Sequence, residues 1–257
     1  MARFWRLPAI LALLVFGILV ELLAFPLCSM GRRRQAIAAW SRALLAACGI
    51  RLAADPRIAT LAPGRMIVAN HMSWLDIFAI DAIAPAAFVA KAEIRRWPLV
   101  GLLVSLAGTV FIERARRHAV HDAIGRLRER IRDGYPVAVF PEATTSDGRR
   151  LLPFHGNLLE AARGEGAEVL VLGLRYTDGG GGHAAEVEYI DEQTFLGSLW
   201  RILGARALCV EVIHVDTIRF EGRNRQQVAT EARLALSRCL ALPLADRAAG
   251  TAPRLPA

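Results

Sequence analysis

The feature that most limits the fold of this chain is an alternation of two patterns that begins near residue 65. Short apolar runs rich in valine, isoleucine and phenylalanine alternate with segments whose apolar residues recur every three or four positions. Such runs are typical of buried strands, and the longer period is typical of helices. Their alternation predicts an α/β domain with a mostly parallel sheet flanked by helices. The predicted strands are 66–69, 87–90, 109–112, 137–140, 169–174, 185–190 and 210–214, and the predicted helices are 73–82, 97–106, 116–132, 157–162 and 223–240.

An apolar run over residues 7–30 comes before this domain and contains one charge, Glu21. As a helix it is long enough to cross a hydrocarbon layer of about 30 Å. A cleaved signal peptide is the alternative, but no A-x-A-like cleavage site follows. Arginines flank both ends of the run, so the positive-inside rule leaves its orientation open. We expect a membrane anchor over residues 1–34.

Residues 36–50 carry apolar side chains at helical spacing with Arg42 among them, which predicts a second, amphipathic helix. It could lie in the membrane interface or pack on the domain as a core helix, because one pattern serves both. At 257 residues the chain has room for one large domain and an appendage. We expect an interfacial helix and linker over 35–60, the α/β domain over 61–245 and a disordered tail over 246–257.

Composition narrows the class of protein. A hydrophobic fraction of 54% with a charged fraction of 22% favours a soluble body attached to a membrane over a multi-span channel. The formal charge is +8, and Lys91 is the single lysine among many arginines. Arginine suits phosphates and anionic lipid surfaces as well as nucleic acid. The four cysteines form no C-x-x-C, so neither a zinc site nor a disulfide framework is predicted.

One motif carries recognisable chemistry. The segment Asn-His-Met-Ser-Trp-Leu-Asp, residues 70–76, follows a predicted strand and enters a predicted helix. This spacing lets the Asp76 carboxylate reach back to the His71 imidazole. The carboxylate would fix the tautomer and leave the other ring nitrogen free to accept a proton from an attacking hydroxyl. Ser73 and Asp76 also match a helix capping box, and both roles can coexist.

Two further motifs end predicted strands. Residues 108–114, Gly-Thr-Val-Phe-Ile-Glu-Arg, finish on Arg114, which can hold a phosphate by a two-pronged contact or simply be solvated. Residues 140–148, Phe-Pro-Glu-Ala-Thr-Thr-Ser-Asp-Gly, place Glu142 and three hydroxyls in a tight turn. Ligand crevices in open α/β sheets lie at the carboxyl ends of the strands, so all three motifs are expected at one edge.

Together the order and spacing of these motifs resemble those of the glycerolipid acyltransferase family, whose members make phosphatidate from lysophosphatidate. The resemblance runs from just before His71 to about Tyr176. The family patterns are N-H-x-x-x-x-D, matched in full, G-x-x-F-I-x-R, matched in full, and F-P-E-G-T-R-S, matched in part. The residues that match are Asn70, His71, Asp76, Gly108, Phe111, Ile112, Arg114, Phe140, Pro141, Glu142, Thr144 and Ser146.

The resemblance implies a glycerol-phosphate acyltransferase-like fold and an O-acyltransferase. It would move a fatty acyl group from acyl-CoA or acyl carrier protein to the hydroxyl of a lysolipid, 1-acyl-sn-glycerol-3-phosphate, with no metal and no cofactor beyond the thioester co-substrate. His71 would be the general base held by Asp76. The expected substrate contacts are Arg114, Glu142, Thr144 and Lys91, although Lys91 could equally be an ordinary exposed lysine.

The chain departs from the family pattern at two positions of the third motif. Ala143 stands where glycine is usual, so a backbone that needs positive φ would be strained there. Thr145 stands where arginine is usual, which removes a partner for the acceptor's phosphate. Members with threonine at that position resemble acyltransferases for lyso-ornithine lipid, so that acceptor is the alternative.

Two readings from other classes compete with an enzyme. A catalytically silent protein could hold a lipid in the same crevice without consuming a thioester. A nucleic-acid binder ranks last, because the basic residues are scattered and no aromatic-studded sheet motif accompanies them. We therefore expect lysolipid, thioester donor and membrane lipids as partners, no nucleic acid, and a location in the cytoplasmic membrane with the catalytic domain on the cytoplasmic side.

Overall fold

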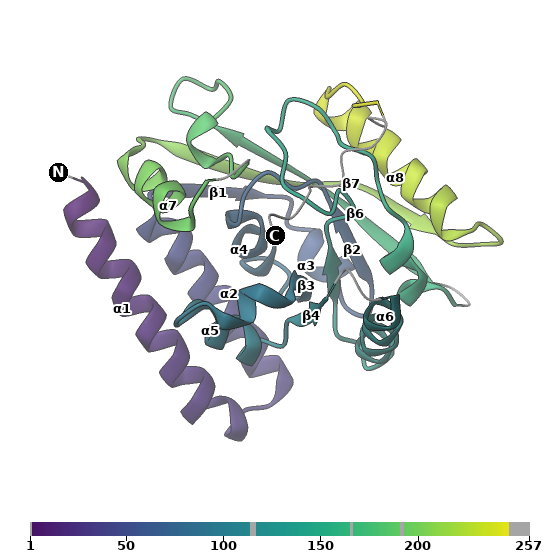
Figure 1. Ribbon diagram of the computed structural model, residues 1–257, viewed down its shortest axis with the longest axis horizontal. Coiled ribbons are helices and arrows are strands. Elements are labelled where there is room, and N and C mark those ends of the chain that lie inside the picture. The colour runs from purple at the N-terminus through teal and green to yellow at the C-terminus, as the bar shows by residue number, and fades with distance from the viewer. Residues whose placement is uncertain (1, 114–116, 165–166, 191–192, 247–257) are drawn as a thin grey trace, which may run out of the picture.

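The computed structural model describes residues 2–113, 117–164, 167–190 and 193–246, and its centre is a seven-stranded sheet (Figure 1). The strand order is β1-β7-β6-β2-β5-β3-β4. Every neighbouring pair is parallel except β6 with β7. The predicted mostly parallel sheet is therefore confirmed. The strands are β1 (Ile50–Ala54), β2 (Met66–Ala69), β3 (Ala87–Lys91), β4 (Val110–Ile112), β5 (Val137–Val139), β6 (Glu168–Thr177) and β7 (Leu208–Arg219).

Helices cover both faces of the sheet, as the fold class requires. The α-helices are α1 (Ala2–Leu23), α2 (Met30–Ala47), α3 (Ile58–Leu61), α4 (Leu75–Asp81), α5 (Val100–Leu106), α6 (Arg117–Arg132), α7 (Phe195–Gly204) and α8 (Arg225–Leu240). Short 3-10 helices are η1 (Phe25–Leu27), η2 (Ala92–Arg96), η3 (Asn157–Ala162) and η4 (Ala185–Val187).

The central strands supply a hydrophobic core to each face. Along β2, Ile67 and Ala69 join the core shared with α2, α4 and α7, while Met66 and Val68 join the core shared with α6 and α8. Successive side chains of a strand point to opposite faces, so this division follows directly from the pleat. All four residues of β2 are buried, which explains why the strand is apolar throughout.

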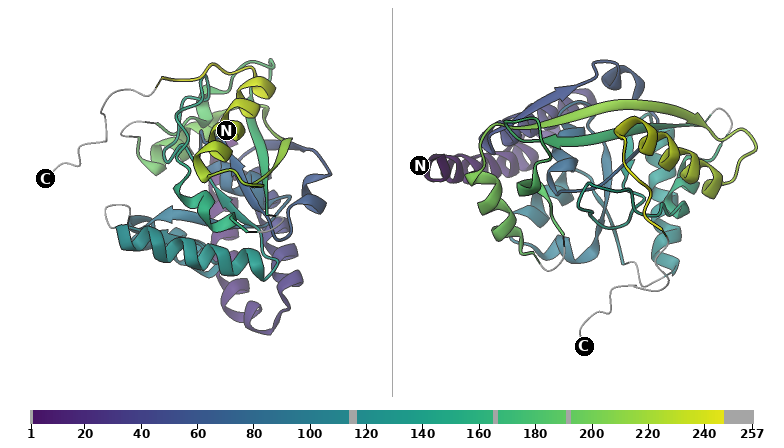
Figure 2. Two further views of the ribbon diagram at one scale, coloured as in Figure 1. Left: turned by 90° about the vertical axis from the view of Figure 1, so that its right-hand side faces the viewer. Right: turned by 90° about the horizontal axis from the view of Figure 1, so that it is seen from above.

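The N-terminal run over residues 7–30 does not form one continuous helix, because α1 ends at Leu23 and α2 begins only at Met30. Pro26 and η1 interrupt it, and α1 and α2 then lie side by side (Figures 1 and 2). The Trp40 indole of α2 donates a hydrogen bond of 2.8 Å to the Leu13 carbonyl, and it passes so close to Gly17 that a Cβ there would lie 2.7 Å from Nε1. By length and composition α1 could cross a membrane, yet it also contacts α2, α5 and α7.

The second helix buries Ala38, Ser41, Leu44 and Leu45 and contacts α4 and β1. It therefore packs on the domain, as the core-helix alternative predicted. It also begins earlier than expected, at Met30.

The structure differs from the expected elements in three places. Residues 185–190 form η4 and a loop, not a strand, because β2 and β7 already occupy both edges of β6. The helix expected over residues 157–162 is present and is of the 3-10 type. The edge strand β1 was assigned to a helix and linker, and α7 was not predicted, since Gly197 and Gly204 weaken its helical pattern.

Candidate active site

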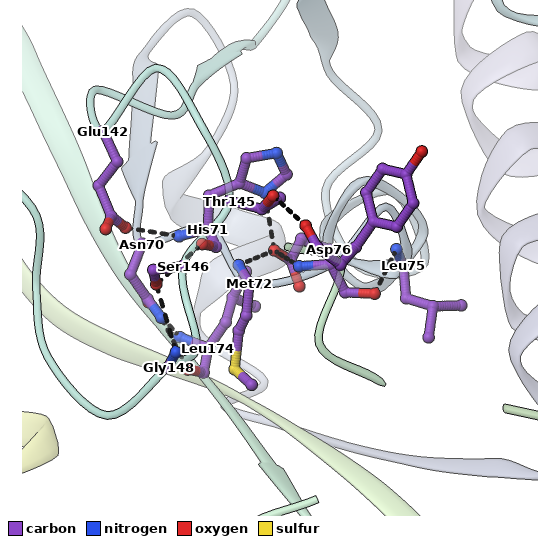
Figure 3. Close-up of polar contacts among 12 residues, drawn as sticks. Asn70, His71, Met72, Leu75, Asp76, Glu142, Thr145, Ser146, Gly148 and Leu174 are labelled. Atoms are coloured by element: carbon purple, nitrogen blue, oxygen red, sulfur yellow. Dashed lines mark hydrogen bonds and ion pairs between the residues drawn. The ribbon is translucent and has the colours of Figure 1, made fainter. Parts of the chain in front are cut away.

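The first motif leaves the sheet at the end of β2, and Asn70 fixes the point of departure. Its side-chain amide donates to the Leu174 carbonyl over 3.0 Å and its oxygen accepts from the Leu174 amide over 2.8 Å (Figure 3). Asn70 is 2% exposed, so this reciprocal pair satisfies polar groups that have no access to water. The pair anchors the following residue, His71, beside the neighbouring strand β6.

The His71 ring meets the Asp76 carboxylate as the spacing predicted. Nδ1 of His71 lies 2.8 Å from Oδ2 of Asp76, which is completely buried. An ionised carboxylate only accepts hydrogen bonds, so Nδ1 carries the proton and Nε2 keeps a lone pair. Across the described residues, Nε2 makes no hydrogen bond, and the His71 side chain is 18% exposed. This nitrogen is available to accept a proton from a bound hydroxyl.

Asp76 also organises the loop that carries His71. Its Oδ2 accepts hydrogen bonds from the Met72 and Ser73 amides at 2.8 and 3.0 Å. Its Oδ1 accepts one from the Tyr176 hydroxyl at 2.8 Å. The Ser73 amide contact is one half of the predicted capping box, but the box is incomplete, because the N-cap of α4 is Trp74 and no described side chain caps the helix. Four hydrogen-bond partners thus surround the buried carboxyl group and fix its position.

The third motif clamps the backbone of His71 from the other side (Figure 3). The His71 amide donates to Oε1 of Glu142 over 2.8 Å. The Ser146 amide and hydroxyl both donate to the His71 carbonyl, over 2.8 and 3.2 Å. The imidazole stacks on Phe140, with ring centroids 3.9 Å apart and planes 8° from parallel. Neighbouring strands β2 and β5 bring the two motifs together, and their contacts fix both the backbone and the ring of His71.

Glu142 has partners other than those expected for a substrate contact. It is 3% exposed, and its second oxygen accepts from the Leu152 amide over 3.0 Å. Burial raises the pKa of Glu142 to about 8, the His71 and Leu152 amides oppose that rise, and the Asp76 charge adds to it. These contacts favour a role in positioning His71 over the predicted orientation of an acceptor.

Two of the remaining predicted contacts, Thr144 and Lys91, follow or end strands at the same edge of the sheet. Thr144 is exposed in the turn after Pro141. Lys91 is exposed at the carboxyl end of β3, which is separated from β2 by β5. Arg114 lies outside the described residues. Thr144 and Lys91 are therefore accessible to a ligand at this edge.

The two unusual residues of the third motif have definite structural roles. Ala143 has φ of +60°, so the turn keeps a left-handed conformation although glycine is missing. The Thr145 hydroxyl donates to the Tyr189 carbonyl, and the Tyr189 amide donates to the Met72 carbonyl over 3.0 Å. The loop between β6 and α7 is thus tied to both the first and the third motif.

We expect Ala143→Gly to raise the free energy of unfolding by about 0.5–1 kcal/mol. A left-handed residue with a Cβ costs roughly 1–2 kcal/mol, and the greater freedom of glycine in the unfolded chain offsets part of the gain. Urea unfolding in detergent measures the difference. Ala39→Gly, on the exposed side of α2, is the matched control and should lower stability instead. A destabilised Ala143→Gly protein would show that the turn is not strained.

Two residues that the sequence did not single out belong to this site. Tyr176 is completely buried and supports Asp76 from β6, and Tyr189 joins the two motifs through its backbone. The alternation along β6 indicates which face Tyr176 occupies. The sequence could therefore indicate the face of β6 on which Tyr176 lies. It could not indicate that Asp76 is its partner, because that contact depends on the pairing of β6 with β2. Tyr189 gave no signal, since its contacts use peptide groups.

Comparison with known proteins adds independent information. A family model described as Acyltransferase matches residues 57–174. A 1-acyl-sn-glycerol-3-phosphate acyltransferase of Neisseria gonorrhoeae is 39% identical over 180 residues, 70% of each chain. A lyso-ornithine lipid O-acyltransferase of Pseudomonas aeruginosa is 34% identical over 205 residues, 79% of this chain and 78% of the relative.

The fold has a match among solved structures. The crystal structure of the 1-acyl-sn-glycerophosphate acyltransferase PlsC from Thermotoga maritima superposes with a TM-score of 0.64. The alignment covers 94% of this chain and 97% of that one, at 19% identity. At this identity the likeness concerns the fold.

Proposed function

Because this chain belongs to the acyltransferase family of enzymes that act on lysophospholipids, we propose that it acylates 1-acyl-sn-glycerol-3-phosphate to form phosphatidate. The observation that carries the proposal is the pairing of His71 with a buried carboxylate, which leaves Nε2 unbonded among the described residues. The similarity to the Neisseria gonorrhoeae relative supports the choice of acceptor.

The reaction needs one proton acceptor and no covalent acyl-enzyme. The acceptor hydroxyl gives its proton to Nε2 of His71 while its oxygen bonds to the thioester carbonyl carbon. The tetrahedral intermediate then expels the thiolate as the carbon–sulfur bond breaks. The thiolate leaves as a thiol with the proton held by the imidazolium, which restores neutral His71.

The surroundings of Asp76 suit this cycle. Its negative charge stabilises the imidazolium that forms after proton transfer, and burial strengthens that interaction. The amides of His71, Met72 and Ser73 already bind carboxylates, so they are not the donors for the developing oxyanion. We assign that role to the turn after Pro141, where the amides of Thr144 and Thr145 make no hydrogen bond within the described part of the chain.

A second acceptor, lyso-ornithine lipid, is favoured by Thr145. Its hydroxyl is engaged with the Tyr189 carbonyl, and it carries no charge that could meet a phosphate. The relative from Pseudomonas aeruginosa has this activity in its name. The proton transfer at His71 would be the same, and only the recognition of the headgroup would differ.

The acyl donor in this proposal is acyl-CoA or acyl carrier protein, and the enzyme works at the cytoplasmic face of the cytoplasmic membrane. The outer side of α1 exposes an apolar surface that includes Leu11, Val15, Phe16 and Leu19. Its inner side contacts the body of the protein. This arrangement supports a helix embedded in one leaflet, beside the domain, over a helix that crosses the bilayer away from it.

An acceptor and donor panel tests the function. Purified protein in vesicles is given lysophosphatidate, lyso-ornithine lipid or lysophosphatidylethanolamine with acyl-CoA or acyl carrier protein, and products are identified by mass. We expect phosphatidate, with one thiol released per ester formed. A faster reaction with lyso-ornithine lipid would move the assignment to the second acceptor. Tight lysolipid binding without thioester consumption would instead identify a silent lipid-binding protein.

A further inference from the structure

The outer face of α7 exposes large apolar side chains next to the candidate active site. Leu196 is 74% exposed and Trp200 is 48% exposed. These residues are four apart, so they share one side of the helix. Other residues of the helix, Leu199, Ile202 and Leu203, are buried in the core. An exposed leucine and tryptophan on one short helix form a patch that suits an apolar partner.

One charge touches this face, because the Arg3 guanidinium of α1 lies over Trp200 and against Gly204 at the end of α7. The single charged residue of α7, Arg201, directs its guanidinium to the Glu188 carbonyl and the Gln193 side chain, so it binds back to the preceding loop. The exposed glycines, Gly197 and Gly204, add no polar side chain. Arg201 therefore does not place its charge on the outward side of α7, and Arg3 covers only the C-terminal end of that side.

Helix α7 packs beside α1 (Figure 2). Arg6 of α1 donates to the carbonyls of Leu203 and Ala205 over 3.1 and 3.0 Å, at the end of α7. The Arg3 guanidinium lies 4.8 Å from the centroid of the Trp200 ring. These contacts fix α7 to the N-terminal part of α1, so a membrane that receives this part of α1 would also come close to α7.

Aromatic contacts connect α7 to the loop that carries His71. The Ser198 hydroxyl accepts a hydrogen bond from the Trp74 indole over 3.1 Å. The Phe195 ring lies 5.0 Å from that of Trp74 and 5.6 Å from that of Trp97, between ring centroids. Trp74 stands between His71 and Asp76 in the chain. A displacement of α7 would consequently reach the loop of the candidate base directly.

We propose that the Leu196 and Trp200 face of α7 inserts into the same lipid leaflet as α1 and is a second membrane contact beside the active site. A bilayer fits as the occupant because α7 packs against a helix that is apolar enough to span one. Exposed Arg95 and Arg96 in η2, next to α5, suit the phosphates of the headgroup layer. Tryptophan favours the boundary between that layer and the acyl chains.

This inference rests on the membrane association within the proposed function, but vesicle binding tests it without catalysis. The variant Leu196→Asn/Trp200→Asn and the wild type are floated with phosphatidylethanolamine and phosphatidylglycerol vesicles. We expect the partition coefficient to fall about tenfold or more, since two apolar side chains lose their lipid contact. Leu234→Asn on α8 is the matched control, 43% exposed and away from this face, and should bind like the wild type.

Two further measurements distinguish a loss of membrane contact from misfolding of the asparagine variant. Leu196→Trp, which adds apolar area without a buried change, should raise the partition coefficient. Brominated lipids should quench the fluorescence of wild-type protein more than that of Trp200→Phe. Unchanged flotation of the asparagine variant, together with equal quenching, would overturn the proposal. Concentration-dependent dimers that the asparagine substitutions abolish would overturn it too, because a second chain would then be the occupant.

Discussion

Replacing His71 with alanine is expected to lower the rate of acyl transfer by about 100- to 10,000-fold, the range that general base catalysis contributes. No other described group takes its place, because the nearby carboxylates Asp76 and Glu142 are buried and already accept hydrogen bonds from the loop. The loss should fall on kcat, since His71 acts on the reacting hydroxyl and binds no headgroup.

The control for this variant is His118→Ala on α6, an exposed histidine far from the first motif in the chain. Release of free thiol with saturating acceptor and donor gives the rate, and circular dichroism with thermal unfolding shows whether each protein is folded. Retention of wild-type kcat by folded His71→Ala protein would rule out the proposed proton transfer.

Asp76→Asn is expected to reduce kcat by about 100-fold or more, since it disables the proton acceptor without removing it. If the amide oxygen faces the Met72 and Ser73 amides, the loop persists but the imidazolium loses its stabilising charge. If the amide turns over, its NH₂ faces Nδ1, and the proton of the ring moves to Nε2. Neither arrangement leaves an effective base.

The variant Tyr176→Phe tests how much the position of Asp76 matters, because it removes a contact that holds Asp76 and leaves the carboxyl group itself unchanged. Removing the hydroxyl leaves Oδ1 of a buried carboxylate without its donor, which costs about 1–3 kcal/mol of stability. We expect a fall in kcat of about tenfold, smaller than for Asp76→Asn, with KM unchanged.

Equal kcat values for Asp76→Asn and the wild type would show that Asp76 is only a structural residue of the loop.

The sequence predicted the parts of the fold that depend on local pattern. The runs that became β2 and β5 are short, apolar and buried on both faces, so periodicity alone identified them. The contact between Asp76 and His71 was also predictable, because it depends on only five residues of chain. It is confirmed by the 2.8 Å distance between Oδ2 of Asp76 and Nδ1 of His71. The catalytic roles of these two residues stay predictions.

Features that depend on distant parts of the chain were not predictable in this way. Tyr176 reaches Asp76 only because β6 pairs with β2 across about a hundred residues. Glu142 was expected at the substrate, but the Leu152 amide, ten residues later, takes its second oxygen. Residues 185–190 alternate like a strand, but β6, the strand before them in the chain, is already paired with β2 and β7 on its two sides.

The reciprocal pair between Asn70 and Leu174 has a consequence for which residues the motif can tolerate. The asparagine side chain offers one donor and one acceptor in the geometry of a peptide group, so it stands in for the next rung of the β2 and β6 ladder. The main chain can then leave the sheet one residue earlier, and the Leu174 amide and carbonyl still have hydrogen-bond partners. Aspartate at position 70 would lack the donor, and leucine would lack both the donor and the acceptor. The hydrogen bonds required at the end of β2 therefore favour asparagine. Because the Asn70 side chain takes the place of a peptide group in the ladder, the chain can leave the sheet at this point, and His71 can face solvent.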